Sequence, residues 1–144
     1  METEKTGRVL TEATIESLQD IWAAERGRIL ADQVRRVTVS DALVDTEATL
    51  LSLPTQMIRQ LGLKEQCRRQ VRNSTGVTET GIYDPVRLTI QGRDCAMDVA
   101  EVSDDTPALI GRLALLQLDF VVDSRSRSLI GNPAHGGEHI FELY

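Results

Sequence analysis

The sequence is poor in aromatic residues and cysteines, and it has no long hydrophobic run. Only 3% of its 144 residues are aromatic, so a core would have to be built from Val, Leu, Ile and Ala. The two cysteines, Cys67 and Cys95, lack the spacing of metal ligands, and we expect free thiols in a reducing compartment. Residues 1–7 offer no apolar core for a secretory signal, and no run approaches membrane-spanning length. These absences predict a soluble, cytoplasmic protein without a membrane partner.

Positive charge is also scarce, with 16 Lys and Arg against 22 Asp and Glu and a net charge of -6. Proteins that bind nucleic acids concentrate Lys and Arg against the phosphates, so this balance argues against a nucleic-acid partner. The local cluster of Arg68, Arg69 and Arg72 is more typical of a solvated strand or loop face than of a binding patch. A chain of this length with 41% hydrophobic residues fits one domain, residues 1–144, around a single core.

The apolar pattern has mostly a period of two, which predicts strands. Turn-forming residues at positions 73–76 and 91–94 indicate two separate hairpins. Residues 19–33 lack clear alternation and predict a connection with a helical turn. A short helix is expected to begin at Pro54 and to stop at Gly62, and another to cover residues 112–118. The fold class is therefore all-β with one or two short helices, and the expected strands cover residues 9–15, 34–44, 66–72, 78–83, 86–90, 96–100, 109–110, 120–122, 129–130 and 140–143.

The most informative segment is an apolar run that ends in an acidic triplet, Ala42-Leu43-Val44-Asp45-Thr46-Glu47-Ala48-Thr49. It differs at one position from Asp-Thr-Gly-Ala-Thr, the motif with which retropepsins and their bacterial single-domain relatives present a catalytic aspartate. A second element in the matching order, Leu109-Ile110-Gly111, follows the two hairpins. Residues 34–130 thus resemble a protomer of the retropepsin-like (clan AA) aspartic peptidases, of the small bacterial single-domain type, with Asp-Thr-Glu in place of Asp-Thr-Gly.

This resemblance implies an acid-protease barrel protomer and a role for each matching residue. Asp45 would be the catalytic aspartate, and Thr46 would lock the active-site loop by hydrogen bonding across a dimer. Glu47, Ala48 and Thr49 would complete that loop. A flap would be formed by Asn73, Ser74, Thr75 and Gly76, and the element crossing beneath the loop by Leu109, Ile110 and Gly111. The family uses no cofactor, and no metal is expected.

Peptide hydrolysis by carboxylates needs two of them, one ionised to draw a proton from water and one protonated to polarise the scissile carbonyl. The chain has no second triplet of the Asp-Thr-Gly kind, so Asp45 must meet its counterpart from a second copy. A two-fold interface brings the same residue of both subunits together. The expected function is therefore that of an aspartic endopeptidase, acting as a homodimer on a peptide or protein substrate.

Glu47 replaces the motif glycine and leaves several interpretations open. Its side chain adds bulk and negative charge beside the expected two-fold axis, and crowded like charges oppose the pairing of the aspartates. One interpretation is an active or weakened peptidase, and another is a silent dimer that binds a peptide or protein partner. Two further alternatives are a cation site made by paired Asp45 and Glu47, and an ordinary turn unrelated to peptidases.

The tail contains a competing motif, since His135, Glu138 and His139 fit the H-x-x-E-H spacing of some zinc peptidases. That chemistry requires a helix, which places residues four apart on one face. Gly136 and Gly137 lie inside the motif and disfavour a helix by about 1 kcal/mol each. We therefore expect a glycine-rich loop whose histidines are surface or packing residues.

Overall fold

The computed structural model describes residues 8–143, and about half of them lie in strands. The all-β fold class is confirmed, although the helical content is larger than predicted. The strands are β1 (Val9–Ser17), β2 (Arg36–Val44), β3 (Leu51–Pro54), β4 (Glu65–Asn73), β5 (Gly76–Ile90), β6 (Arg93–Val102), β7 (Leu109–Ile110), β8 (Phe120–Asp123) and β9 (Ser128–Gly131). The helices are α2 (Leu18–Glu25), α3 (Thr55–Gln60) and α4 (Arg112–Leu118), with 3-10 turns η1 (Ala31–Gln33) and η2 (Pro133–His135).

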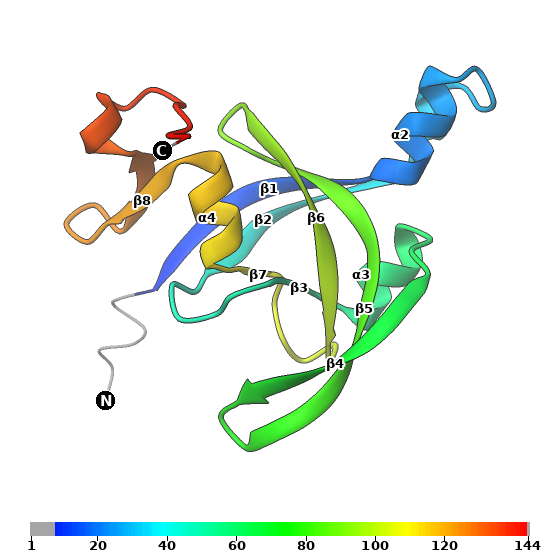
Figure 1. Cartoon of the computed structure of the whole chain (residues 1–144), viewed down its shortest axis with the longest axis horizontal. Coiled ribbons are helices and arrows are strands. Elements are labelled where there is room, and N and C mark those ends of the chain that lie inside the picture. Colours follow the sequence, from blue (N-terminus) through cyan, green and yellow to red (C-terminus); the bar gives the residue numbers. More distant parts are fainter. Residues whose placement is uncertain (1–7, 144) are drawn as a thin grey trace.

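Seven strands form one mixed sheet in the order β1-β2-β7-β3-β6-β5-β4, and β1 also pairs with β5. The pairs β2–β7 and β3–β6 are parallel, and the other pairs in the sheet are antiparallel. β8 and β9 form a separate two-stranded sheet. Figure 1 shows a strongly curved sheet, with α4 directly after β7 and the β4–β5 hairpin projecting away from α4. None of the described helices has the length and apolar character needed to cross a membrane.

The core is aliphatic, as the scarcity of aromatic residues predicts. Phe120 is the one aromatic side chain in the described core cluster, and it is 5% exposed. Burial of these branched aliphatic side chains supplies the main driving force for folding. The largest fully buried side chains come from five strands, one helix and the turn after α3: Ile15, Leu51, Leu53, Leu61, Val86, Leu88, Ile90, Val99, Ile110 and Leu118.

The prediction of two separate hairpins is wrong, because a single strand of 15 residues, β5, belongs to both. Its outer part pairs with β4, and its inner part pairs with β1 and β6. The register shifts between Tyr83 and Val86, where Pro85 has no N–H to give to a ladder. Asp84 is buried in this bulge and accepts a hydrogen bond from the backbone N–H of Lys64 at 3.0 Å. The proline and the broken alternation account for the false boundary in the sequence pattern.

Helix α2 is longer than the single helical turn expected in residues 19–33. The hydroxyl of Ser17 caps it by accepting a hydrogen bond from the backbone N–H of Asp20 at 3.2 Å. A serine followed three residues later by an acidic residue is thus the signal that predicts this helix start. The helix after β3 is confirmed, but Pro54 is its cap and the last residue of β3, and the helix begins at Thr55.

The last predicted strand, residues 140–143, is wrong, since this segment has no regular secondary structure. It finds no neighbouring strand, because β8 and β9 pair only with each other and the segment lies instead against the end of α4. An alternation of apolar and polar residues is not sufficient for a strand without a pairing edge.

An ion pair ties α2 to the start of β2. Asp20 accepts hydrogen bonds from the backbone N–H of Arg35 at 3.0 Å and from its guanidinium at 2.8 Å and 3.0 Å. These contacts, led by the side-chain bond to Arg35, lower the pKa of Asp20. A carboxylate with a lowered pKa stabilises the fold above its unfolded pKa, and this stability is lost as the pH falls through the folded pKa.

We expect Asp20→Asn to lower the free energy of unfolding at neutral pH by about 1–2 kcal/mol, because the amide replaces a charged acceptor of three hydrogen bonds. The loss should shrink in acid, where the wild-type carboxylate also becomes neutral. Urea unfolding at several pH values measures it. Asp32→Asn, which removes an exposed carboxylate from η1, is the matched control and should leave stability unchanged.

Candidate active site

The loop that carries Asp45 is fixed at its base by two parallel strands. β2 and β7 pair with Leu43 opposite Leu109 and Val44 opposite Ile110. The backbone N–H of Leu43 donates to Ala108 O at 2.8 Å, and that of Asp45 donates to Ile110 O at 3.0 Å. The predicted order of these two elements therefore places Leu109 and Ile110 directly alongside the strand that ends at Asp45.

Inside the loop, the backbone holds the Asp45 carboxylate. The N–H of Glu47 donates to Asp45 Oδ1 at 3.0 Å, and the N–H of Ala48 donates to the carbonyl oxygen of Asp45 at 3.2 Å. Asp45 is half-buried, whereas Thr46 and Glu47 are exposed in this single chain. The Asp45 carboxylate is thus oriented by a backbone donor and remains partly exposed to solvent.

The carbonyl groups of the same loop satisfy the start of α4. The N–H of Arg112 donates to Ala48 O at 2.8 Å, and that of Leu113 donates to Thr49 O at 3.2 Å. The first N–H groups of a helix have no partner within the helix, so the loop takes the place of a capping side chain. The guanidinium of Arg112 also donates to the Thr49 hydroxyl at 2.9 Å. Loop and helix thus form one hydrogen-bonded unit.

Gly111 allows this unit to close. A Cβ atom at Gly111 would lie 2.7 Å from Leu50 O, 2.9 Å from Ala48 O and 2.9 Å from the carbonyl carbon of Thr49. All three are backbone atoms, which cannot rotate away as a side chain would. A glycine is needed at position 111 because the backbone of the Asp45 loop lies so close to it. The φ of Gly111 is -93°, so backbone strain is not the reason.

The backbone at Glu47 does not require glycine. Positive φ among the described residues other than glycine occurs only at Gln91, Asp119 and Arg127. Glu47 lies outside the left-handed region, its N–H donates to the Asp45 carboxylate, and the residue is exposed. The conformation of the loop is therefore one that a residue with a side chain adopts without backbone strain at position 47.

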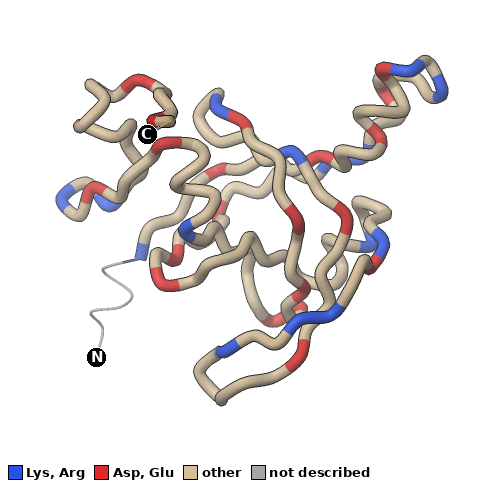
Figure 2. The backbone as a smooth tube through the Cα atoms, in the orientation of Figure 1, with Lys and Arg blue, Asp and Glu red and all other residues tan. Residues whose placement is uncertain are grey.

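The four residues expected to form a flap lie at the tip of the β4–β5 hairpin. Asn73 pairs with Gly76, and the Asn73 side chain accepts hydrogen bonds from the backbone N–H and the hydroxyl of Thr75 at 3.0 Å and 2.7 Å. Gly76 has a φ of +123°, which favours glycine. Ser74 is exposed beside them. Figure 2 shows basic residues along β4 of this projecting hairpin.

The basic cluster predicted to be a solvated face is exposed on β4. Arg68 contacts two carboxylates of the same hairpin, Glu65 at 3.2 Å and Glu79 at 3.1 Å, and these contacts raise its pKa. Because its charge is neutralised locally, Arg68 adds little to a binding patch for a polyanion. The two cysteines are free, and burial raises the pKa of Cys95 to about 11.

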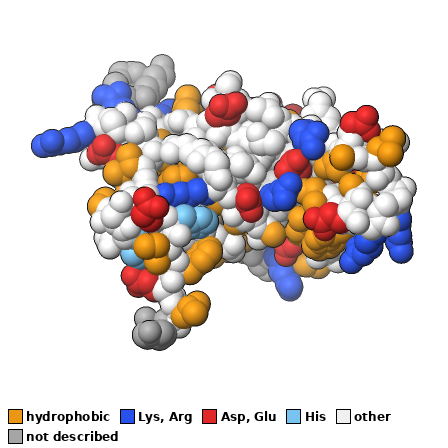
Figure 3. All heavy atoms as spheres, turned by 90° about the horizontal axis from the view of Figure 1, so that it is seen from above, with side chains coloured by type: hydrophobic (Ala, Val, Ile, Leu, Met, Phe, Trp, Pro, Cys, Tyr) orange, Lys and Arg blue, Asp and Glu red, His pale blue; other side chains and the backbone are white. Residues whose placement is uncertain are grey.

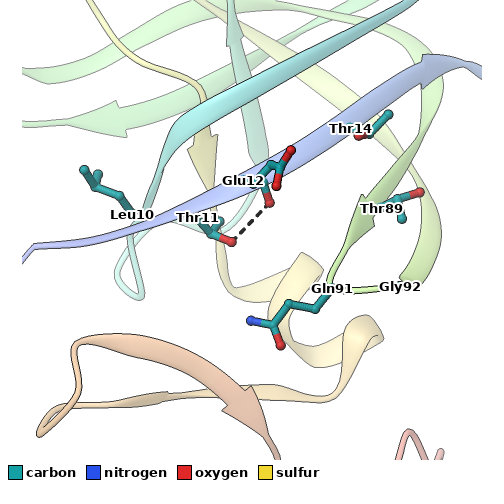
Figure 4. A pocket seen from close by; sticks show the side chains of 7 residues that line it. All are labelled: Leu10, Thr11, Glu12, Thr14, Thr89, Gln91 and Gly92. Atoms are coloured by element: carbon teal, nitrogen blue, oxygen red, sulfur yellow. Dashed lines mark hydrogen bonds between the residues drawn. The ribbon is translucent and has the colours of Figure 1, made fainter.

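Two shallow hollows are present on the described surface. The first has a volume of about 520 Å³ and lies between β1 and the β5–β6 turn, where polar side chains line it (Figure 4): Leu10, Thr11, Glu12, Thr14, Thr89, Gln91 and Gly92. The second has a volume of about 450 Å³ and includes Thr49 and Arg112 beside the Asp45 loop. Asp45 lines neither of them.

The H-x-x-E-H segment does not form a helix. Gly136 and Gly137 both have positive φ, and the rings contact different groups, His135 between two carboxylates and His139 at the carbonyl of Gln117. Within residues 8–143, no three His, Cys, Asp or Glu side chains gather closely enough to hold a metal ion. The described residues of the tail and of the Asp45 loop thus offer no built ligand set for zinc or a hard cation.

Two features of the site were missed in the sequence. The sequence pattern places Arg112 in a helix. It does not predict the contact of Arg112 with Thr49, because the two residues are 63 positions apart. The contact of His135 with Asp119 spans 16 positions and likewise has no periodic signal. No protein-family model matches the chain, and no curated protein matches it either. The geometry of the described residues is therefore the basis for a functional proposal.

Proposed function

We propose that this chain is one protomer of a homodimeric, retropepsin-like aspartic endopeptidase with an acid-protease barrel. The observation that carries the proposal is the Asp45 loop, in which a half-buried carboxylate accepts a hydrogen bond from a backbone N–H and is framed by β7 and Gly111. Two copies related by a two-fold axis would bring two Asp45 carboxylates together. The β4–β5 hairpin of each copy would then serve as a flap over an extended peptide.

The proposed chemistry divides two tasks between two identical residues. One Asp45 is ionised and takes a proton from the attacking water, while the other is protonated and donates a hydrogen bond to the scissile carbonyl. Two adjacent carboxylates share one proton because like charges at close range disfavour double ionisation. The exposure of Thr46 in the single chain leaves its hydroxyl free to bond across the interface.

A second candidate, a silent dimer that binds a peptide or protein partner, is favoured by one observation at the same loop. Glu47 is exposed next to the half-buried Asp45. A dimer would place two Glu47 side chains near the aspartate pair, where their bulk can displace the water and their charge opposes the shared-proton state. The two candidates share the fold and the interface, and differ only in whether bond cleavage occurs.

Glu47→Gly is expected to raise the rate of peptide cleavage by about tenfold, which corresponds to about 1.4 kcal/mol of relieved repulsion. Glu47→Gln keeps the size and removes the charge, so it separates the two effects. The assay uses a mixed peptide library from acid to neutral pH, with products identified by mass spectrometry. Sedimentation of each variant at micromolar concentration shows whether the dimer is present.

The outcomes separate the candidates. Cleavage by the wild type supports the peptidase, and cleavage that appears only in Glu47→Gly supports the silent dimer. A protein that sediments as a folded monomer and cleaves nothing in any variant would remove both, since neither function exists without a pair of Asp45 residues.

A further inference from the structure

The side chain of His135 lies between two carboxylates at the end of the described chain. Its Nδ1 is 2.6 Å from Asp119 Oδ2, and its Nε2 is 2.6 Å from Glu142 Oε2. The side chains of His135 and Asp119 are 13% and 8% exposed, whereas that of Glu142 is 69% exposed. An imidazole can donate from both nitrogens only when it is protonated. The arrangement therefore matches an imidazolium with one buried and one exposed partner.

Asp119 is the fixed member of this cluster. It ends α4 with a φ of 60°, and its carboxylate also accepts hydrogen bonds from the Asn132 side chain at 3.2 Å and from the backbone N–H of Ile140 at 3.1 Å. The contact with His135, followed by these bonds, lowers the pKa of Asp119 to about 2. Asp119 therefore stays ionised through the range in which a histidine titrates.

Other contacts hold the tail up to residue 140 whatever the charge of His135. Arg93, in the first position of β6, donates to the carbonyl oxygens of Leu118 at 3.0 Å and Gly137, and its guanidinium lies 4.6 Å from the centre of the Phe120 ring. The His139 Nε2–H donates to Gln117 O at 2.9 Å. Only Glu142 links the last described residues, 141–143, to the His135 ring.

Two charged groups contact the His135 ring, and both act in the same direction. Asp119 and Glu142 touch the ring and raise the pKa of His135, with the bond to Asp119 the larger cause. Arg93 reaches the same segment through backbone carbonyls, and His139 and Glu138 belong to the tail itself. Figure 3 shows the histidines at the surface beside a basic side chain and hydrophobic side chains. Burial of the ring opposes this rise in pKa, and the two carboxylates in direct contact outweigh it.

We propose that His135 is a protonation latch that holds residues 141–143 against the end of α4. The imidazolium donates from Nδ1 to Asp119 and from Nε2 to Glu142. When it loses one proton to solvent, the remaining proton stays on Nδ1 towards the buried carboxylate. The bare Nε2 lone pair then faces the ionised Glu142, the contact becomes repulsive, and the exposed carboxylate leaves.

The latch acts in a defined direction. A histidine with a raised pKa contributes its full stabilisation below its unfolded pKa and loses it as the pH rises through the folded pKa. Residues 141–143 are thus held at lower pH and released at higher pH. Release frees the exposed side chain of Leu143 (88% exposed) and leaves Phe141 (62% exposed) with the contact of its ring to His139, 5.0 Å between ring centres, while Ile140 remains bound through its N–H to Asp119. This device does not depend on the proposed peptidase activity.

NMR on the full chain, from pH about 5 to about 9, tests the latch. The ring carbon shifts of His135 report its titration, and ¹³C relaxation of the Leu143 methyl groups reports the order of the tail without interference from amide exchange. In the wild type, Leu143 should lose order with the same midpoint as the His135 titration, while the Ile140 methyl groups stay ordered. A midpoint that differs from that of His135, or no loss of order, would overturn the proposal.

Glu142→Gln removes the charge that defines the latch. The amide can accept from an imidazolium or donate to a neutral imidazole, so we expect a lower His135 pKa and a Leu143 order that no longer follows pH. Glu138→Gln removes the same charge from the same segment without a contact to the ring, and it should behave as the wild type. Equal His135 titration curves for both variants would also contradict the latch.

Discussion

Asp45→Asn is expected to lower peptide cleavage by on the order of 10³-fold, because an asparagine can neither take a proton from water nor share one with its counterpart. The amide keeps the size of the side chain and can keep an oxygen towards the N–H of Glu47. The fold and the dimer should therefore remain, which circular dichroism and sedimentation check. Asp41→Asn, an exposed position on β2, is the matched control and should retain full activity.

Mixing wild-type and Asp45→Asn subunits tests whether one active site is shared between two subunits. If each active unit needs one Asp45 from both subunits, adding Asp45→Asn protein at constant total concentration should reduce activity as the square of the wild-type fraction. A site contained in one chain gives a linear decrease instead. A linear decrease, or activity retained by Asp45→Asn alone, would rule out the symmetric aspartate pair.

Gly111→Ala is expected to lower the free energy of unfolding by about 3 kcal/mol. The added methyl group would meet the backbone of residues 48–50 at 2.7–2.9 Å, so either the Asp45 loop or the start of α4 must move. Such a movement also breaks the hydrogen bonds from the helix N–H groups to the carbonyls of Ala48 and Thr49. Denaturant unfolding measures the loss as a shift of the midpoint.

Gly81→Ala on β5 is the control for this change. A Cβ there would meet the side chains of Glu65 and Tyr83 at 2.9 Å, and the Glu65 carboxylate can rotate away. Neither glycine has a positive φ, so the comparison isolates backbone from side-chain contacts. The control should lose at most about 1 kcal/mol. Similar losses for both variants would show that Gly111 is not a special point of close approach.

The sequence predicted the features that depend on local patterns. The hairpin around Gln91 and Gly92 is confirmed, because alternation on both sides and two residues with positive φ act within a few positions. The glycine stop at Gly62, with a φ of +67°, is confirmed for the same reason. The Asp45 loop was located because a short motif and a second short element occur in the expected order.

The features that the sequence did not predict depend on distant partners or on a local exception. The single strand β5 was divided at Pro85, because the sequence does not show that the residues before and after a bulge continue in the same sheet. The tail was assigned a strand because its alternation resembles one, whereas its place is set by Asp119 and Gln117, about 20 residues earlier. Contacts between residues this far apart do not produce a periodic pattern in the sequence.

The length of β5 has a mechanical consequence. Its outer residues form the projecting hairpin with β4, and its inner residues are clamped on both sides by β1 and β6. Asp84, buried at the bulge, fixes the start of β4 through the N–H of Lys64. The hairpin thus projects from a strand that is anchored in the core, and the bulge at residues 84–85 is the point at which it can bend. A substitution that makes this bulge more or less rigid would therefore change the range of movement of the hairpin tip, although the residues of the tip stay the same.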